Sequence, residues 1–380
     1  MFDWFSSTRI IHGEGAISRI KGEMARHGAE RAVLLTDPGV EKTGLAGAVA
    51  DSMGALCVGV FGEITRDTGF EVIDAACDFA SGLEADSVVS VGGGSVMDTG
   101  KVLSVLLREG GKAKDHAGLY VLKRGGVTHI CIPTTAGTGS EVTSVAVVLS
   151  DDRSRKVYYL SEYLSPHAAI LDPSMTLGLP RALTASTGMD AITHAIEATV
   201  SKLKNPIATA LAMGAVRIIR SKLPECVRNG TDIASRADMQ VAATMAGMAF
   251  NSAPVGLAHC VAHAAGALCG VPHGVANGIV LPAVMRHNSV ACFPETARLA
   301  REMGVPVEGK TDEETAELAT TEVENLLREI DHPRRFSEVG VKESDIGLIA
   351  ELALTDPALF TNPRECREAA EVEKIIREVF

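Results

Sequence analysis

The strongest constraint on the fold is a set of short apolar runs that recur through the first half of the chain. They are rich in Val, Ile and Leu, as expected for strands buried on both faces of a parallel sheet. Helical patterns such as GFEVIDAACDFASG (69–82) lie between several of them. The runs are RAVLLTD (31–37), ALCVGVFG (55–62), SVVSVGGG (87–94), THICIPTT (128–135) and AAILDP (168–173). The alternation predicts an α/β domain over residues 1–180.

After about residue 180 the strand-like runs stop and long helical periodicity takes over. Clear helical segments are 182–201, 206–223 and 235–250. Thr311 with Glu314 fits a capping box at a later helix start, and Asn362 followed by Pro363 fits another. The sequence therefore predicts an all-α domain over residues 181–380.

Composition and charge exclude several classes of protein. The net charge of −12 argues against a nucleic-acid binder, which needs a basic face for phosphate. No uninterrupted apolar stretch reaches transmembrane length, and the first residues lack the basic and apolar regions of a secretory signal. The eight cysteines are scattered without a CxxC pair, which favours reduced thiols. We therefore expect a cytoplasmic protein that binds neither nucleic acid nor membrane.

The segment VSVGGGSVMDTGK (89–101) predicts a strand that runs through three glycines into a helix. Glycines let the backbone approach a ligand, and the N–H groups of a helix start favour an anion. The segment is not a Walker A loop, because Ser95 and Val102 stand where that motif needs Gly and Ser or Thr. Met97 likewise breaks a GxGxxG pattern. Taken alone, the segment fits a phosphate site and a tight structural turn about equally.

A second polar loop, IPTTAGTGSE (132–141), also follows a strand. It offers the hydroxyls of Thr134, Thr135 and Thr138. The carboxyl ends of parallel strands meet at one edge of a sheet, where open α/β sheets bind ligands. The pair of loops therefore favours a nucleotide.

Asp37 ends the first predicted strand of this series. A carboxylate at that place can accept hydrogen bonds from an adenosine ribose and repel a 2′-phosphate. Asp37-Pro38-Gly39 is also good turn chemistry, and spacing alone favours the turn.

The segment GMDAITHAIEA (188–198) places Asp190 and His194 four residues apart, on one face of a predicted helix. Such a pair can chelate a metal, but it can equally form a simple hydrogen bond. For this pair alone the hydrogen bond is the favoured interpretation.

The apolar run PVGLAHCVAHAAGALCGVPHG (254–274) contains three further histidines. His259 and His263 share a helix face, and His273 lies beyond a predicted helix break. A carboxylate with imidazoles suits Fe²⁺ or Zn²⁺. Spacing alone leaves open which histidine is not a ligand and whether this run meets residues 190–194. A core of hydrogen-bonded histidines is the weaker alternative.

Four ordered motifs together resemble the iron-containing (group III) alcohol dehydrogenases. They are GGGSVMDTGK, PTTAGTGSEVT, GMDAITHAIE and GLAHCVAHAAGALCGVPHGVANGIVLP. The resemblance extends through almost the whole chain. It implies a dehydroquinate synthase-like architecture: a dinucleotide-binding α/β domain with a Rossmann-like parallel sheet (1–180), and an all-helical metal-binding domain (181–380).

The resemblance also implies roles for the acidic and histidine residues. In that family one Asp and three His hold the metal, and these fall on Asp190, His194, His259 and His273. His263 then lies beside the metal as a catalytic residue, facing the substrate or relaying a proton.

The family's cofactor is NAD(H). An acidic residue at the position of Asp37 goes with a preference for NAD in that family. The resemblance therefore favours a ribose contact for Asp37, although spacing alone favours a turn. Phe250 and Val145 fall at the substrate pocket, where Val145 suggests a less polar pocket than in small-polyol members. The stretch ITRDT (64–68) departs from a PNPT-like pattern, so Arg66 alters a contact near the cofactor. The remaining family cofactor contacts fall on Gly94, Ser95, Asp98, Thr134, Thr135, Thr138 and Lys156.

The function implied is hydride transfer between a short-chain alcohol or aldehyde and NAD(H), with Fe²⁺ (or Zn²⁺) as the metal, in a homodimer or larger homo-oligomer. One alternative is a zinc-dependent polyol dehydrogenase of the glycerol type, which uses one Asp and two His. A metal-free relative like maleylacetate reductase and a non-catalytic nucleotide-binding redox sensor are the others.

Overall fold

The computed structural model describes residues 1–150 and 156–380. The chain separates into two compact units. One contains Phe5–Leu179, and the other contains Pro180–Phe380 together with Met1–Trp4. The change of unit at Pro180 coincides with the point where the strand-like runs of the sequence end.

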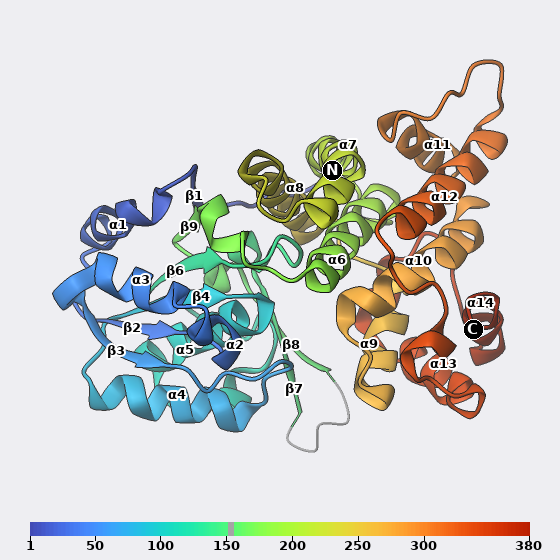
Figure 1. The fold of residues 1–380 in the computed structure, drawn as a ribbon. Coiled ribbons are helices and arrows are strands. Elements are labelled where there is room, and N and C mark those ends of the chain that lie inside the picture. The colour runs from blue at the N-terminus through green and yellow to red at the C-terminus, as the bar shows by residue number, and fades with distance from the viewer. Residues whose placement is uncertain (151–155) are drawn as a thin grey trace. The chain divides into compact units, whose positions relative to one another are not determined.

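The first unit contains a six-stranded parallel sheet in the order β1-β9-β6-β4-β2-β3 (Figure 1). All five apolar runs of the sequence form strands of this sheet, so the predicted parallel sheet is confirmed. The edge strand β1 was not predicted. The strands are β1 (Arg9–His12), β2 (Ala32–Leu35), β3 (Cys57–Phe61), β4 (Ser87–Gly92), β6 (Thr128–Pro133) and β9 (Ala168–Leu171).

Helices cover both faces of this sheet. Leu34 packs on one face in a core with side chains of α1 and α3. Its neighbours Val33 and Leu35 pack on the other face with side chains of α4 and α5. Burial on both faces explains why the strands are apolar throughout. The helices of this unit are α1 (Ile20–Arg26), α2 (Pro38–Lys42), α3 (Leu45–Met53), α4 (Phe70–Gly82) and α5 (Gly94–Glu109).

A second, three-stranded sheet lies against α5 and was not predicted. Its order is β5-β8-β7, and β7 pairs with β8 in antiparallel register. Val102 and Val105 of α5 share a core with Ala146 and Tyr159 of this sheet. The strands are β5 (Gly118–Leu119), β7 (Val145–Leu149) and β8 (Lys156–Leu160).

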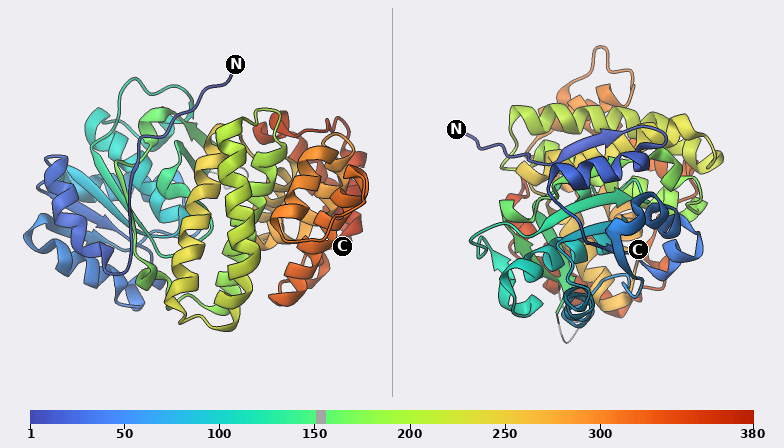
Figure 2. Two further views of the ribbon diagram at one scale, coloured as in Figure 1. Left: turned by 90° about the horizontal axis from the view of Figure 1, so that it is seen from above. Right: turned by 90° about the vertical axis from the view of Figure 1, so that its left-hand side faces the viewer.

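The second unit is helical, as predicted, and its long helices α6, α7 and α8 pack against one another (Figure 2). Helix α12 begins with the predicted capping box between Thr311 and Glu314. The helices are α6 (Arg181–Val200), α7 (Pro206–Arg228), α8 (Ile233–Ser252), α9 (Leu257–Cys269), α10 (His273–Ser289), α11 (Phe293–Glu302), α12 (Asp312–Glu329), α13 (Ile346–Leu354) and α14 (Ala369–Glu378).

The predicted helix start at Asn362 is wrong, because α14 begins only at Ala369. The Asn362 side chain does not cap its own segment. Its Oδ1 instead accepts a hydrogen bond from the backbone N–H of Leu257, at the start of α9. A distant partner in the fold has replaced the local one that the sequence suggested.

No single helix in the described part of the chain is long and apolar enough to cross a membrane. Helices α8 and α9 reach that length and composition only as a pair, with a bend of 103° between them.

Candidate metal and cofactor sites

Helix α6 carries three ionisable side chains along one face. Asp190, His194 and Glu197 follow one another at intervals of four and three residues, which keeps them on the same side of a helix. All three are buried in the second unit. Buried acids and imidazoles on an otherwise apolar helix need partners from its neighbours.

Helices α9 and α10 supply the facing histidines. His259 and His263 lie one turn apart on α9, which ends at Gly270 in the left-handed conformation (φ 69°). Pro272 precedes α10, and His273 is its first residue. The predicted helix break before His273 is therefore present, and it lets His273 turn back toward α6.

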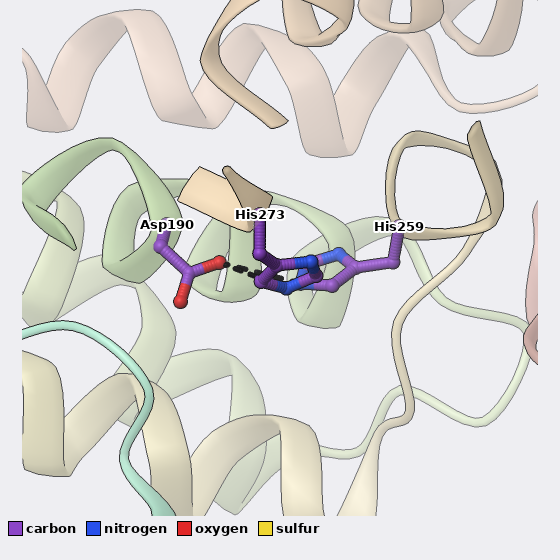
Figure 3. Close-up of side chains that lie close together, drawn as sticks. All are labelled: Asp190, His259 and His273. Atoms are coloured by element: carbon purple, nitrogen blue, oxygen red, sulfur yellow. Dashed lines mark ion pairs between the residues drawn. The ribbon is translucent and has the colours of Figure 1, made fainter. Parts of the chain in front are cut away.

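Asp190, His259 and His273 point toward one another from three different helices (Figure 3). Asp190 Oδ1 lies 3.3 Å from His273 Nε2 and 3.8 Å from His259 Nε2. One possible ligand atom from each residue lies within 4.8 Å of the other two. Asn277 Nδ2 donates a hydrogen bond of 2.8 Å to Asp190 Oδ1 and so holds the carboxylate in place. The three segments that spacing alone could not bring together meet here.

The electrostatics of this group favour a charged Asp190 carboxylate and a neutral His259 ring. Burial would raise the pKa of Asp190, but the surrounding imidazoles outweigh it and lower that pKa below its ordinary value. Burial, followed by the nearby His194, lowers the pKa of His259 well below its ordinary value. A neutral imidazole keeps one nitrogen lone pair, which is the form that binds a metal.

The environment of His259 fits a metal ion. Its Nδ1 lies 2.6 Å from Glu197 Oε2, and its buried Nε2 makes no hydrogen bond to any residue that the structure describes. A buried polar nitrogen without a hydrogen bond costs free energy unless another ligand satisfies it. Carboxylate and imidazole donors suit Fe²⁺ and Zn²⁺.

His194 lies at the border of this group. Its ring stacks on that of His259 at a centroid distance of 4.5 Å and on that of Phe250, from α8, at 4.3 Å. Its ligand atoms do not join the cluster formed by Asp190, His259 and His273. The structure thus places His194 in contact with one proposed ligand and with the residue predicted for the substrate pocket.

His263 lies beside the cluster formed by Asp190, His259 and His273. Its ring stacks on that of His273, with centroids 5.1 Å apart. Its Nδ1 lies 2.7 Å from Asp356 Oδ2, so a carboxylate fixes this ring as well. The same carboxylate accepts a hydrogen bond from the backbone N–H of Ala358 through Oδ1.

In the first unit, the two predicted polar loops lie side by side at the carboxyl ends of β4 and β6. The backbone N–H of Thr134 donates to the carbonyl of Gly92 at 3.0 Å. A Cβ added to Gly94 would lie 2.8 Å from Thr138 Cγ2, so this close approach requires glycine. Helix α5 starts at Gly94 without a side-chain cap, and helix starts of this kind favour an anion.

Asp98 is tied into the interior of this unit. Its Oδ1 accepts from Ser140 Oγ at 2.6 Å, and its Oδ2 accepts from the backbone N–H of Val147 at 3.0 Å. The ammonium group of the fully buried Lys101 lies 3.4 Å from the same carboxylate. The predicted cofactor contact at Asp98 therefore also holds α5 to the segment that leads into the second sheet.

The remaining predicted cofactor residues have partners within the chain. Lys156 pairs with Asp67, and the backbone N–H of Asp67 donates to Ser95 Oγ at 3.3 Å. Arg66 Nε lies 3.5 Å from Asp67 Oδ2. Asp37 Oδ1 caps α2 by accepting from the backbone N–H groups of the next turn. These hydrogen bonds are of the local turn type that the spacing of Asp37, Pro38 and Gly39 predicts.

Two further predicted residues lie in the first unit: Thr135 as a cofactor contact and Val145 as a pocket residue. Both are half-buried. Thr135 lies next to Gly93, where an added Cβ would be 3.6 Å from its side chain. Val145 begins β7, and its carbonyl accepts a hydrogen bond of 2.6 Å from Lys101 Nζ.

Sequence reasoning missed five partners of the predicted residues. Glu197 had a signal, because it continues the α6 face that carries Asp190 and His194. Asn277 had a weaker signal of the same kind, because it stands four residues after His273 on a helix. Asp356 and Asp67 gave no such signal, because their partners His263 and Lys156 are distant in the sequence. Lys101 follows Asp98 by one helical turn, but its contact with Val145 depends on the fold.

Comparison with known proteins agrees with this architecture. Residues 7–173 match the model of the iron-containing alcohol dehydrogenases, and residues 184–380 match that of the Fe-containing alcohol dehydrogenase family, C-terminal. The chain is 35% identical to the NAD-dependent methanol dehydrogenase of Bacillus methanolicus over 96% of each protein. It is 36% identical to the 1,3-propanediol dehydrogenase of Citrobacter freundii over 100% of this chain and 99% of the relative.

A solved structure of a 1,3-propanediol oxidoreductase superposes on the chain with a TM-score of 0.96, at 35% identity and with both chains fully covered. Fold and sequence thus agree with these relatives over nearly the whole length. The chain belongs to the iron-containing alcohol dehydrogenase family.

Proposed function

We propose that this protein is a metal-dependent alcohol dehydrogenase that also reduces aldehydes, with NAD(H) as the hydride carrier and a short-chain alcohol or aldehyde as substrate. The observation that carries the proposal is the buried meeting of Asp190, His259 and His273, in which His259 Nε2 has no hydrogen-bond partner in the described chain. The NAD dependence of the methanol dehydrogenase relative supports the choice of cofactor.

The proposed metal ligands are Asp190, His194, His259 and His273. Three of them already converge, and His194 contacts His259 through its ring. When bound, a divalent ion supplies a Lewis acid that stabilises negative charge on the substrate oxygen. Asn277 supports the site by holding the carboxylate of Asp190.

The proposed cofactor site is the edge of the large sheet where the two loops meet. The N–H groups at the start of α5 would hold the pyrophosphate, and the nearby threonines offer hydroxyls. Asp37 Oδ1 caps α2, while Oδ2 makes no hydrogen bond to the described chain and would accept from a ribose. The proposed contacts are Asp37, Gly94, Ser95, Asp98, Thr134, Thr135, Thr138 and Lys156.

His263 is the proposed residue for proton transfer. Asp356 binds its Nδ1, which directs the opposite nitrogen, Nε2, away from that carboxylate. An imidazole held in this way can pass a proton from one nitrogen to a neighbouring group. Phe250 and Val145 are the proposed pocket residues, and both offer apolar surface to a short carbon chain.

The proposed setting is the cytoplasm, and the proposed assembly is a homodimer or larger homo-oligomer. All eight cysteines are free thiols, as expected where thiols stay reduced.

The proposal is tested by purifying the protein without oxygen, measuring its metal content, and following NADH oxidation with a panel of short aldehydes. We expect about one iron per chain and turnover of at least one aldehyde. Bound zinc with a preference for glycerol would favour the polyol dehydrogenase alternative. Absence of metal, and of activity after Fe²⁺ or Zn²⁺ is added, would overturn the proposal.

Replacing His263 with Ala should lower kcat by about 100-fold while the metal stays bound, because general acid–base groups contribute factors of that order. The measurement is steady-state turnover together with metal content. Loss of the metal from this variant would place His263 among the ligands and contradict its proposed role.

Replacing Gly94 with Ala should weaken NADH binding by about tenfold, or roughly 1.4 kcal/mol. The new methyl group would press on Thr138 and displace the two loops from each other. Fluorescence titration with NADH measures the effect. Gly47→Ala is the matched control, because nothing lies within 4 Å of a Cβ at that position. Equal NADH affinity in both variants would argue against this cofactor site.

A further inference from the structure

Glu197 is a buried acid for which the proposed function names no role. It is 3% exposed, deep in the helical unit. A buried carboxyl group needs a full set of hydrogen bonds, and those of Glu197 all come from one place.

All three of its hydrogen-bond donors belong to the start of α9. Oε2 accepts from the backbone N–H of Gly256 at 2.9 Å, and Oε1 accepts from that of Ala258 at 2.7 Å. Oε2 also lies 2.6 Å from His259 Nδ1. Helix α9 has no side-chain cap from its own N-cap residue, so Glu197 from α6 and Asn362 together supply this cap.

The cap fixes the ring of His259 as well as the helix. An ionised carboxylate can only accept a hydrogen bond, so this contact requires the single proton of the neutral imidazole on Nδ1. Nε2 then keeps its lone pair, and it is Nε2 that lies 3.8 Å from Asp190 Oδ1. The contact with Glu197 thus sets both the direction and the tautomer of the ring.

We propose that Glu197 is a positioning residue of the metal site, which holds His259 with Nδ1 protonated and Nε2 aimed at the metal. This inference rests on the proposed function, because it takes His259 to be a ligand. Carboxylates bound to the second nitrogen of a metal-binding histidine commonly act in this way, and their loss weakens metal affinity 10- to 100-fold.

The chain contains a matched control for this role. Asp356 also accepts from a histidine Nδ1 and from the backbone N–H of a helix start, namely His263 and Ala358. His263 is not a proposed ligand. The variants Glu197→Gln and Asp356→Asn therefore make the same chemical change, and only the first acts on a proposed ligand.

Glu197→Gln forces a conflict at the start of α9. Its NH₂ group must face either the N–H of Ala258 or the pair formed by Gly256 N–H and His259 Nδ1. In the second arrangement the NH₂ would donate to Nδ1 and drive the ring proton onto Nε2.

We expect the dissociation constant for Fe²⁺ or Zn²⁺, measured by competition with a chelator, to rise 10- to 100-fold in Glu197→Gln. Asp356→Asn should leave that constant within about twofold of wild type.

Equal metal affinity in Glu197→Gln and wild type would overturn the proposal, and so would an equal loss in both variants. The second measurement is made on wild-type protein: ¹⁵N NMR of the histidine rings without metal. The signals of His259 are assigned by their absence in the variant His259→Gln. We expect a proton on Nδ1, and a proton on Nε2 would refute the role of Glu197. If wild type binds neither metal, the proposed function fails, while the NMR result still decides the contact between Glu197 and His259.

Discussion

His273→Ala is expected to lose the metal and nearly all dehydrogenase activity while keeping its fold. The ring begins α10, and its Nε2 lies 3.3 Å from Asp190 Oδ1. Its side chain is 36% exposed, so its removal opens no large cavity. Because loss of a residue that only orients a ligand costs 10- to 100-fold in metal affinity, loss of a ligand itself should cost more than about 100-fold.

Metal content, the chelator-competition dissociation constant and NADH oxidation measure this effect. His287→Ala is a suitable control, because His287 lies near the other end of the same helix and contacts Cys366 rather than the metal cluster. That variant should bind the metal like wild type. If His273→Ala retains its metal and its turnover, His273 is a packing residue and the proposed ligand set is wrong.

The large sheet could be predicted because each of its central strands is buried on both faces. That burial leaves a continuous apolar run in the sequence, as in SVVSVGGG, and the run is visible without any partner. Strand β8 of the small sheet lacks this signal. Residues of β8 are only half-buried apart from Tyr159, so the run KVYYL mixes polar and apolar residues and resembles an ordinary surface segment.

The candidate site was predictable in its residue types but not in its assembly. Helical spacing links Asp190 to His194 and His259 to His263, since these relations are local. The approach of α6, α9 and α10 depends on tertiary packing, and only the resemblance to a family supplied it in advance. Asn362 is a second example of a contact that depends on tertiary packing. Its local sequence predicts a cap for the segment that follows it, but its side chain binds the start of the distant helix α9.

Lys101 is the clearest case of a role that the sequence did not reveal, and it carries the largest expected effect on stability. It follows the glycine loop, yet its side chain is fully buried within the first unit. Its ammonium group donates to Ser140 Oγ at 2.8 Å, to Thr143 Oγ1 at 2.9 Å and to the carbonyl of Val145 at 2.6 Å. The carboxylate of Asp98, 3.4 Å away, balances its charge. These contacts join α5 to the chain that enters the small sheet.

Lys101→Met should therefore destabilise the first unit by about 3 kcal/mol or more, because it leaves a largely buried carboxylate without its countercharge and three acceptors without a donor. Calorimetry of the full chain should show the melting temperature of that unit fall by roughly 6 °C or more. Lys112→Met is the control: Lys112 is exposed, lies 3.8 Å from Asp74, and should shift that temperature by less than about 2 °C. Equal melting temperatures for the two variants would mean that the buried ammonium contributes no more than a surface ion pair. The carboxylate and hydroxyls around it would then have to be satisfied by other groups. Helix α5 would be held to the small sheet by apolar packing and by the hydrogen bond from the Val147 N–H to Asp98.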